Sequence, residues 1–248
     1  MRIPDAVTAL ERDLRGIFGR RLQSMVVYGL RAPDARHSAH GSHAADGSDH
    51  GALTHTLAVV DTLSSDDLRA CTGHVGRWQD SGLDTPLLVA AHEFGRSLDV
   101  FPFEFGAILA DHVLVAGSDP FDGLRVEPAD QRRACEVQAR GHLLHLREGY
   151  LETRGRGDAL AVLIVQSAPA FAALLTSVAH LDAVEVRGGA AAARHVERRL
   201  ELTSGAATAI VALVGVGEIS SAEAERLFAP YLDTVGRLVT YIDRWTRG

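Results

Sequence analysis

The sequence predicts a mixed α/β sheet domain over residues 1–125, followed by an all-α helical bundle over residues 126–248. In the first half, short apolar runs that end at turn residues alternate with amphipathic segments. From about residue 127 the strand pattern stops, and long segments with helical periodicity follow. The chain has 248 residues and 46% of them are hydrophobic, so each part can bury a core of its own.

The first half opens with an amphipathic helix over residues 6–22. Its apolar side chains recur at helical spacing, at Val7, Leu10, Leu14, Ile17 and Leu22. The run SMVVYGL follows and predicts a buried strand that ends at a turn glycine, Gly29. Residues 32–51 are rich in Ala, Gly, Ser, Asp and His and predict a loop. The run LTHTLAVVD, residues 53–61, predicts the second strand.

A second helix is predicted in SSDDLRACTGHVGRW, which begins with a capping serine and two acids. Its apolar residues Leu68, Cys71, Val75 and Trp78 share one face. The run TPLLVAAHEF, residues 85–94, predicts a third strand. Residues 98–115 are apolar and aromatic and predict one or two further strands.

The second half reads as successive helices. A long amphipathic helix is predicted over residues 128–154, with Pro128 in its first turn. Residues 159–181 are long enough to span a bilayer and carry no charged side chain, but they are rich in alanine and contain Pro169. We expect one helix, or two joined at Pro169, buried in the bundle, and no membrane span. Residues 191–202, residues 205–216 and a last segment capped by Ser220 or Ser221 complete the bundle.

Charge and cysteine content narrow the function classes. The net charge is −7 and no lysine occurs, so the chain lacks the basic cluster that non-specific nucleic-acid binding requires. Cys71 and Cys135 lie far apart and predict two buried thiols in a reducing compartment. Charges near the N-terminus interrupt the apolar core that a signal peptide needs, so we expect a cytoplasmic protein.

A helix, a strand ending in VVYG, a loop and a strand reading LAVVD resemble the nucleotidyltransferase superfamily. The segments DVFPFEF, HVLVAGSDPF and HLLHLREGYL look like those of predicted bacterial nucleotidyltransferase-like proteins with a C-terminal helical domain. The resemblance covers nearly the whole chain. It implies a nucleotidyltransferase-like sheet domain followed by a helical partner domain.

The same resemblance exposes departures at the expected active site. In the family, the first strand ends in Gly-Ser, and the second carries an Asp-x-Asp pair whose carboxylates hold Mg²⁺ against the triphosphate. Here Gly29 is retained, Leu30 replaces the serine, and Thr54 and Thr56 stand at the two aspartate positions. Asp99 and Glu104 are weak candidates for a third acid. We therefore expect a catalytically degenerate site, with Mg²⁺ as a cofactor only if the transferase site is active.

The histidine-rich segment HSAHGSHAADGSDH, residues 37–50, falls in the gap between Gly29 and Thr54. This gap is longer than the family resemblance implies. A solvated low-complexity loop explains the composition most simply. The alternative is a Zn²⁺ or Ni²⁺ site built from His37, His40, His43 and His50.

The favoured function is that of a pseudoenzyme that binds a nucleotide or a protein partner. The alternative is an active, divergent transferase that moves a nucleoside monophosphate from NTP onto a small molecule or a protein. Metal binding by the histidine loop is a third alternative. A protein partner or a second copy would be bound through the helical domain, where residues 210–216 and the last helix carry many apolar positions. We expect no nucleic acid and no membrane among the partners.

Overall fold

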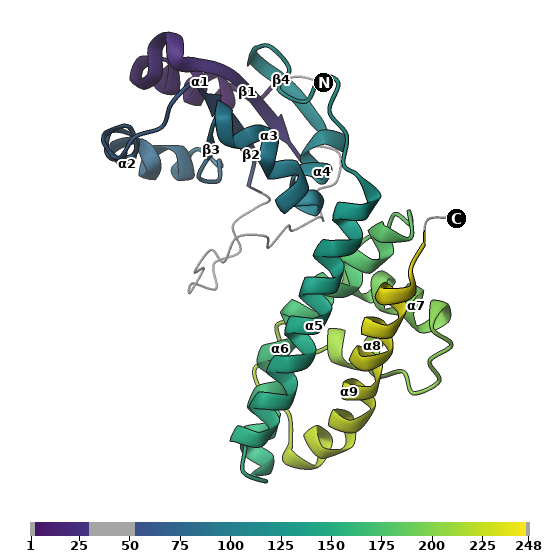
Figure 1. The fold of residues 1–248 in the computed structure, drawn as a ribbon. Coiled ribbons are helices and arrows are strands. Elements are labelled where there is room, and N and C mark those ends of the chain that lie inside the picture. The colour runs from purple at the N-terminus through teal and green to yellow at the C-terminus, as the bar shows by residue number, and fades with distance from the viewer. Residues whose placement is uncertain (1–2, 30–52, 247–248) are drawn as a thin grey trace. The chain divides into compact units, whose positions relative to one another are not determined.

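The computed structural model describes residues 3–29 and 53–246. Internal packing divides the chain into two compact units, Met1–Glu127 and Pro128–Gly248 (Figure 1). The first unit combines a sheet with helices, and the second is built from helices, so the predicted fold class is confirmed.

The first unit contains a four-stranded mixed sheet with the strand order β3-β2-β1-β4. Strand β1 pairs antiparallel with both β2 and β4, whereas β3 pairs parallel with β2. In chain order the elements are α1 (Asp5–Phe18), a 3₁₀ turn (Gly19–Arg21), β1 (Leu22–Tyr28), β2 (His55–Val60), α2 (Ser65–Asp80), β3 (Leu87–Ala90), α3 (Ala91–Val100), α4 (Pro102–Ala110) and β4 (His112–Gly117).

Helices cover both faces of this sheet (Figure 1). Successive side chains of β1 and β2 point to opposite faces, so each face has an apolar core of its own. Val27 and Ala58 pack with α1 and α2 on one face. Val26 and Leu57 pack with α3 and α4 on the other. Both central strands are therefore buried on two sides, which explains their nearly continuous apolar sequences.

One predicted strand is shorter than expected, and a segment predicted to supply one or two strands supplies one strand and is otherwise mostly helical. The run at residues 85–94 is a strand only over Leu87–Ala90, and α3 begins at Ala91. The Glu93 carboxylate accepts a hydrogen bond from the Ala90 N–H at 3.2 Å, which favours the helix start. Residues 98–115 supply the end of α3, all of α4 and most of β4, so they contribute one strand. Short apolar runs fit a buried helix as well as a buried strand, and periodicity alone does not separate them.

The capping signal before α2 is confirmed. The Ser64 hydroxyl accepts a hydrogen bond from the Asp67 N–H at 3.2 Å, and the Asp67 carboxylate accepts one from the Ser64 N–H at 2.9 Å. Arg21 donates two hydrogen bonds to the same carboxylate, at 2.8 and 2.7 Å. Donation from Arg21, then from Ser64, holds the pKa of Asp67 well below its ordinary value.

The second unit is a helical bundle. Its helices are α5 (Pro128–Glu152), α6 (Gly157–Leu181), α7 (Gly189–Arg199), α8 (Ala206–Val211) and α9 (Ser221–Arg244). Helix α6 packs against the other four, and Pro169 lies inside it without dividing it in two. Ser220 caps α9 by accepting a hydrogen bond from the Glu223 N–H at 3.2 Å.

Helix α6 is long and apolar enough to cross a membrane by length and composition. Eleven of its residues are buried, including Ile164, Phe171 and Leu175, which have no exposed surface. This is the packing of a core helix in a bundle and is consistent with a soluble protein. Cys71 and Cys135 are both buried and free, as predicted.

Most apolar side chains of α9 are buried inside the bundle. Tyr231, Val235, Leu238 and Ile242 are fully buried, as is Ile210 of α8. Most of the apolar residues considered for a partner surface are therefore buried within the bundle, whereas Val214 and Val216 beyond α8 are exposed.

Candidate functional site

Thr56, which stands at the second expected aspartate position, lies in an apolar row of the sheet. It pairs with Val27 of β1, and Val27 pairs with Val113 of β4. Thr56 is 1% exposed, and its hydroxyl has no hydrogen-bond partner among the described residues. Residues directly opposite one another point to the same face, so this row offers one neutral oxygen beside Val27, with Val113 on the far side of Val27.

Thr54 and Gly29 continue the sheet by one residue. The Thr54 N–H donates to Gly82 O at 2.9 Å, and Thr54 O accepts from the Asp84 N–H at 3.0 Å. The Gly29 N–H donates to Asp111 O at 3.2 Å, and Gly29 has a φ of +72°, a conformation that favours glycine. Gly29 thus has a backbone conformation of the kind that the predicted turn requires. Leu30 and the four candidate histidines His37, His40, His43 and His50 lie outside the described residues.

Asp99 and Glu104 do not lie on a strand. Asp99 is exposed on α3 and Glu104 is partly buried on α4, and these helices cover the face of the sheet opposite to Thr56. Within residues 3–29 and 53–246, no three His, Cys, Asp or Glu side chains are grouped so that they could hold a metal ion. Mg²⁺ requires several oxygen ligands and usually one or two carboxylates. The residues around Thr56 do not fit this ion.

The structure instead brings three ring side chains together on the α3–α4 face. Tyr28 at the end of β1 pairs with His55 at the start of β2 and with His112 at the start of β4. The Tyr28 and His55 rings stack at 5.6 Å, and the His112 ring lies 4.9 Å from that of Phe121. We call Tyr28, His55 and His112 the ring row. Because successive residues of a strand face opposite sides, His55 points away from the face that Thr56 occupies.

A carboxylate stands at each end of the ring row. His55 Nδ1 lies 3.1 Å from Asp84 Oδ2, and His112 Nε2 lies 3.2 Å from both oxygens of Asp119. His112 Nδ1 faces the carbonyl oxygens of Ile108 and Leu109 at the end of α4, at 3.0 and 3.1 Å. A hydrogen on this nitrogen would be donated to those carbonyl groups, which would fix the ring orientation.

Burial, charge and hydrogen bonding shift the pKa values of two groups in and beside the ring row, Tyr28 and Asp119. Burial, with a smaller effect of the nearby Asp84 charge, raises the pKa of Tyr28 to about 12, so its hydroxyl stays protonated near neutral pH. Desolvation acts to raise the pKa of Asp119, but hydrogen bonds from the Phe121 N–H and from His112 outweigh it and lower the pKa overall. The row therefore offers a phenol and two imidazoles, each imidazole beside an acid.

The sequence contained part of the signal for this row. In LTHTLAVVD, His55 is the residue between the two threonines. A comparison with the Asp-x-Asp motif considers only positions 54 and 56, so it does not identify His55 as a candidate. The pairing of Tyr28 with both histidines depends on the strand order, which one sequence does not specify.

The polar groups of the helical unit serve its own packing. Tyr231 OH donates to Ser167 Oγ at 3.1 Å and lies 2.6 Å from His142 Nε2. Asp182 binds Tyr241 OH, Trp245 Nε1 at 3.2 Å and His195 Nε2 at 2.8 Å. These contacts join α5 to α6 and α9, and α6 to α7 and the end of α9, so they are structural.

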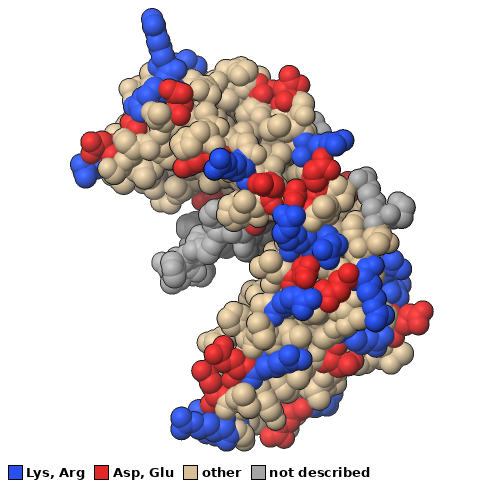
Figure 2. Space-filling view, viewed as in Figure 1, with Lys and Arg blue, Asp and Glu red and all other residues tan. Residues whose placement is uncertain are grey.

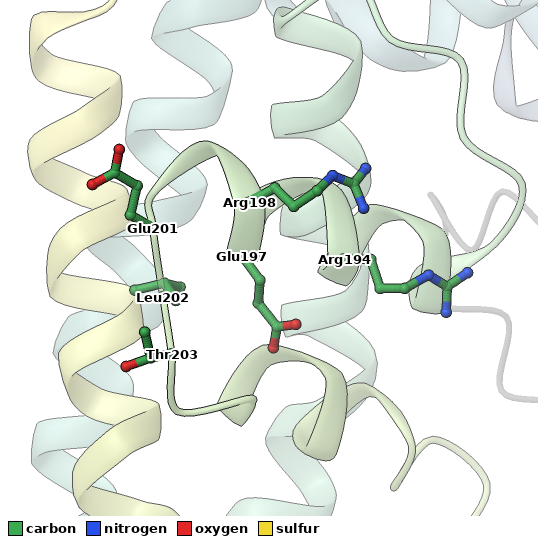
Figure 3. A pocket seen from close by; sticks show the side chains of 6 residues that line it. All are labelled: Arg194, Glu197, Arg198, Glu201, Leu202 and Thr203. Carbon is green, nitrogen blue, oxygen red and sulfur yellow. The ribbon is translucent and has the colours of Figure 1, made fainter.

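A shallow hollow beside α7 is lined by charged side chains that do not point toward a common centre. It is lined by Arg194, Glu197, Arg198, Glu201, Leu202 and Thr203. Figure 3 shows Arg194 and Arg198 directed away from Glu201. Glu197 is occupied, because it accepts hydrogen bonds from the N–H and the hydroxyl of Thr208, at 2.9 and 2.8 Å. On the face of the molecule in Figure 2, arginines and acids are interspersed over the described part of the chain.

By sequence, the chain matches no protein-family model, and no curated protein matches it. Its fold nevertheless defines a class. A helix leads into an antiparallel strand pair, a parallel third strand follows, and helices come behind the sheet domain, which is a nucleotidyltransferase-like fold.

A particular solved structure shares this fold. The crystal structure of spectinomycin adenyltransferase AAD(9) from Enterococcus faecialis with ATP and spectinomycin is similar to this chain with a TM-score of 0.51. The match covers 94% of this chain and 98% of the other, at 10% sequence identity. At this identity the likeness shows the fold alone.

Proposed function

We propose that this protein is a catalytically degenerate member of the nucleotidyltransferase-like class that acts by binding a nucleotide or a protein partner. The observation that carries the proposal is the place of Thr56. The strand position expected to present a metal-binding carboxylate holds a buried hydroxyl in a row with Val27 and Val113.

Attack on the α-phosphate of an NTP develops negative charge, and this fold class neutralises it with carboxylate-bound Mg²⁺. A threonine hydroxyl brings no charge, and hard divalent cations prefer charged oxygen ligands. Thr54 has the same deficiency, and Asp99 and Glu104 lie on helices of the opposite face. The positive φ of Gly29 supports the binding part of the proposal, because the turn that approaches a triphosphate in this fold class needs such a glycine.

The experiment is a pair of measurements on the full chain. Thermal unfolding is followed with ATP, GTP or Mg²⁺ alone and with each nucleotide together with Mg²⁺. Binding at a hundredfold excess over the dissociation constant adds about 2.7 kcal/mol to stability, so even weak sites are detected. Pyrophosphate release is then measured with MgATP and spectinomycin, which accompany the similar structure, and with further small-molecule and protein acceptors.

We expect no Mg²⁺-dependent pyrophosphate release and no stabilisation that requires nucleotide and Mg²⁺ together. Stabilisation by nucleotide without Mg²⁺ would identify the nucleotide as the bound species. If no nucleotide stabilises the chain, the result favours a protein partner as the bound species. Acceptor-dependent release of pyrophosphate would refute the degenerate assignment.

The ring row favours the second candidate, an active but divergent transferase. Tyr28, His55 and His112, with Asp84 and Asp119, give this edge of the sheet groups that could bind a phosphate or accept a proton. If pyrophosphate is released, Asp84→Asn and Asp119→Asn decide whether the row is responsible. Loss of release in these variants, with melting temperature unchanged, would assign the chemistry to the row.

A further inference from the structure

The two histidines of the ring row differ in what they leave open to a ligand. Both ring nitrogens of His112 are occupied: Nδ1 faces two carbonyl oxygens at the end of α4, and Nε2 lies 3.2 Å from both oxygens of Asp119. In His55 only Nδ1 is occupied, 3.1 Å from Asp84 Oδ2. Its Nε2 has no hydrogen-bond partner among the described residues, and the side chain is 33% exposed. Of these two residues, His55 alone offers a ring nitrogen to a ligand.

Asp84 determines which hydrogen-bonding role this nitrogen has. Its Oδ1 accepts from the Thr85 N–H at 2.7 Å, and its own N–H donates to Thr54 O at 3.0 Å, so the carboxylate is held in place. An ionised carboxylate can only accept, which puts the shared hydrogen on Nδ1 of His55. Nε2 of the neutral imidazole is then an acceptor. Because the ring also stacks on Tyr28, its plane is fixed, and a ligand that meets Nε2 has to donate a hydrogen.

The place of His55 beside Gly29 narrows the part of a nucleotide that it can meet. A Cβ added at Gly29 would lie 3.8 Å from Cδ2 of His55, so the imidazole edge lies close to this glycine. Phosphates that approach such a glycine are ionised near neutral pH and have no hydrogen to donate, and the charge of Asp84 opposes them at Nε2. The ribose is joined directly to the phosphates and carries hydroxyl groups, whereas the amino group of a base lies farther away.

We propose that Nε2 of His55 accepts a hydrogen bond from a ribose hydroxyl group of a bound nucleotide, and that Asp84 holds this nitrogen in its accepting state. This inference rests on the proposed binding of a nucleotide and deepens it, because it names the ribose as the recognised part. Ribonucleotides should then bind more tightly than their deoxy analogues. One hydrogen bond at a partly exposed site corresponds to about a three- to tenfold difference in affinity.

Calorimetric titration of the full chain with ATP, 2′-deoxy-ATP and 3′-deoxy-ATP, without Mg²⁺, tests the contact. One deoxy analogue should bind about three- to tenfold more weakly than ATP. His55→Phe keeps a ring beside Tyr28 but removes the acceptor, so it should bind ATP and that analogue equally. His145→Phe is the matched control, because His145 is 83% exposed on α5, and it should keep the preference.

The outcomes separate this inference from the proposed function. If no nucleotide binds, the nucleotide arm of the proposed function fails, and the ribose contact fails with it. If ATP binds but neither hydroxyl group affects the affinity, the ribose contact alone is refuted. Inosine triphosphate lacks the base amino group of ATP. A preference for ATP over inosine triphosphate that His55→Phe abolishes would assign the contact to the base and overturn the ribose assignment.

The tautomer of His55 is tested without any ligand. Nitrogen-15 NMR of the imidazoles, assigned by comparison with His55→Phe, reports which ring nitrogen carries the hydrogen. The natural chain should show hydrogen on Nδ1. Asp84→Asn removes the constraint and should give the other tautomer and a weaker ribose preference, whereas Asp66→Asn, at an 84% exposed side chain on α2, should change neither. Hydrogen on Nε2 of His55 in the natural chain would refute the proposal.

Discussion

The Nε2 atom of His142 on α5 lies 2.6 Å from the hydroxyl of Tyr231 on α9, inside the helical bundle. The imidazole stacks on Phe171 at 5.6 Å, so an apolar ring covers one of its faces. Burial, with a smaller effect of His145, lowers the pKa of His142 to about 4. The bundle therefore holds a neutral histidine at its centre.

This pair makes the bundle sensitive to acid. The pKa of His142 is near 6.5 in the unfolded chain and about 4 in the folded chain. The contribution of neutral His142 to the free energy of unfolding is therefore complete above pH 6.5 and is lost as the pH falls toward 4. The shift corresponds to about 3 kcal/mol in the free energy of unfolding. Urea unfolding at pH 7.5 and pH 4.5 should show this loss. His142→Phe should reduce the pH dependence, and an unchanged slope would contradict the assignment.

Gly117 at the end of β4 is predicted to tolerate no side chain. Its φ is +77°, and a Cβ would lie 1.8 Å from the carbonyl oxygen of Gln23 in the neighbouring strand. Gly123 is the matched control, because it has a similar φ of +74° with nothing within 4 Å. Gly123→Ala should cost about 1–2 kcal/mol from backbone strain. Gly117→Ala should cost clearly more, measured by chemical unfolding, because the edge of the sheet has to separate.

The histidine-rich segment is predicted to be dispensable for stability. Residues 37–50 contain almost no apolar side chains, so their removal takes little from either core. Deleting them should leave the free energy of unfolding nearly unchanged. Calorimetric titration with Zn²⁺ checks the alternative: stoichiometric binding tighter than micromolar that disappears on deletion would show that the segment is a metal site.

The fold class could be predicted because its signals are local. The cap at Ser64, the apolar repeat of α1 and the long amphipathic pattern of α5 depend on nearby residues alone. The boundary between β3 and α3 could not be predicted, since LLVAAHEF is apolar enough for either structure and Glu93 acts only once the helix has started.

Less of the candidate site than of the fold could be predicted from the sequence. Threonine at positions 54 and 56 is visible in the sequence, but the apolar row around Thr56 depends on the register of β1 against both neighbours. The ring row depends on the same register, because its three members come from strands far apart in sequence. The burial of the α9 apolar face depends on packing with α5 and α6, which periodicity alone does not specify.

Thr56 offers a direct test of the degenerate assignment by two substitutions of similar size. Thr56→Val removes a buried hydroxyl that has no partner among the described residues, so stability should be unchanged or should rise by up to about 1 kcal/mol. Thr56→Asp places a buried carboxylate beside Val27, and a buried charge without a partner costs about 3 kcal/mol or more. Chemical unfolding with and without Mg²⁺ measures both. If Mg²⁺ stabilises Thr56→Asp but not the natural chain, Thr56 marks the lost metal ligand; if Mg²⁺ with nucleotide stabilises the natural chain as well, the degenerate assignment fails.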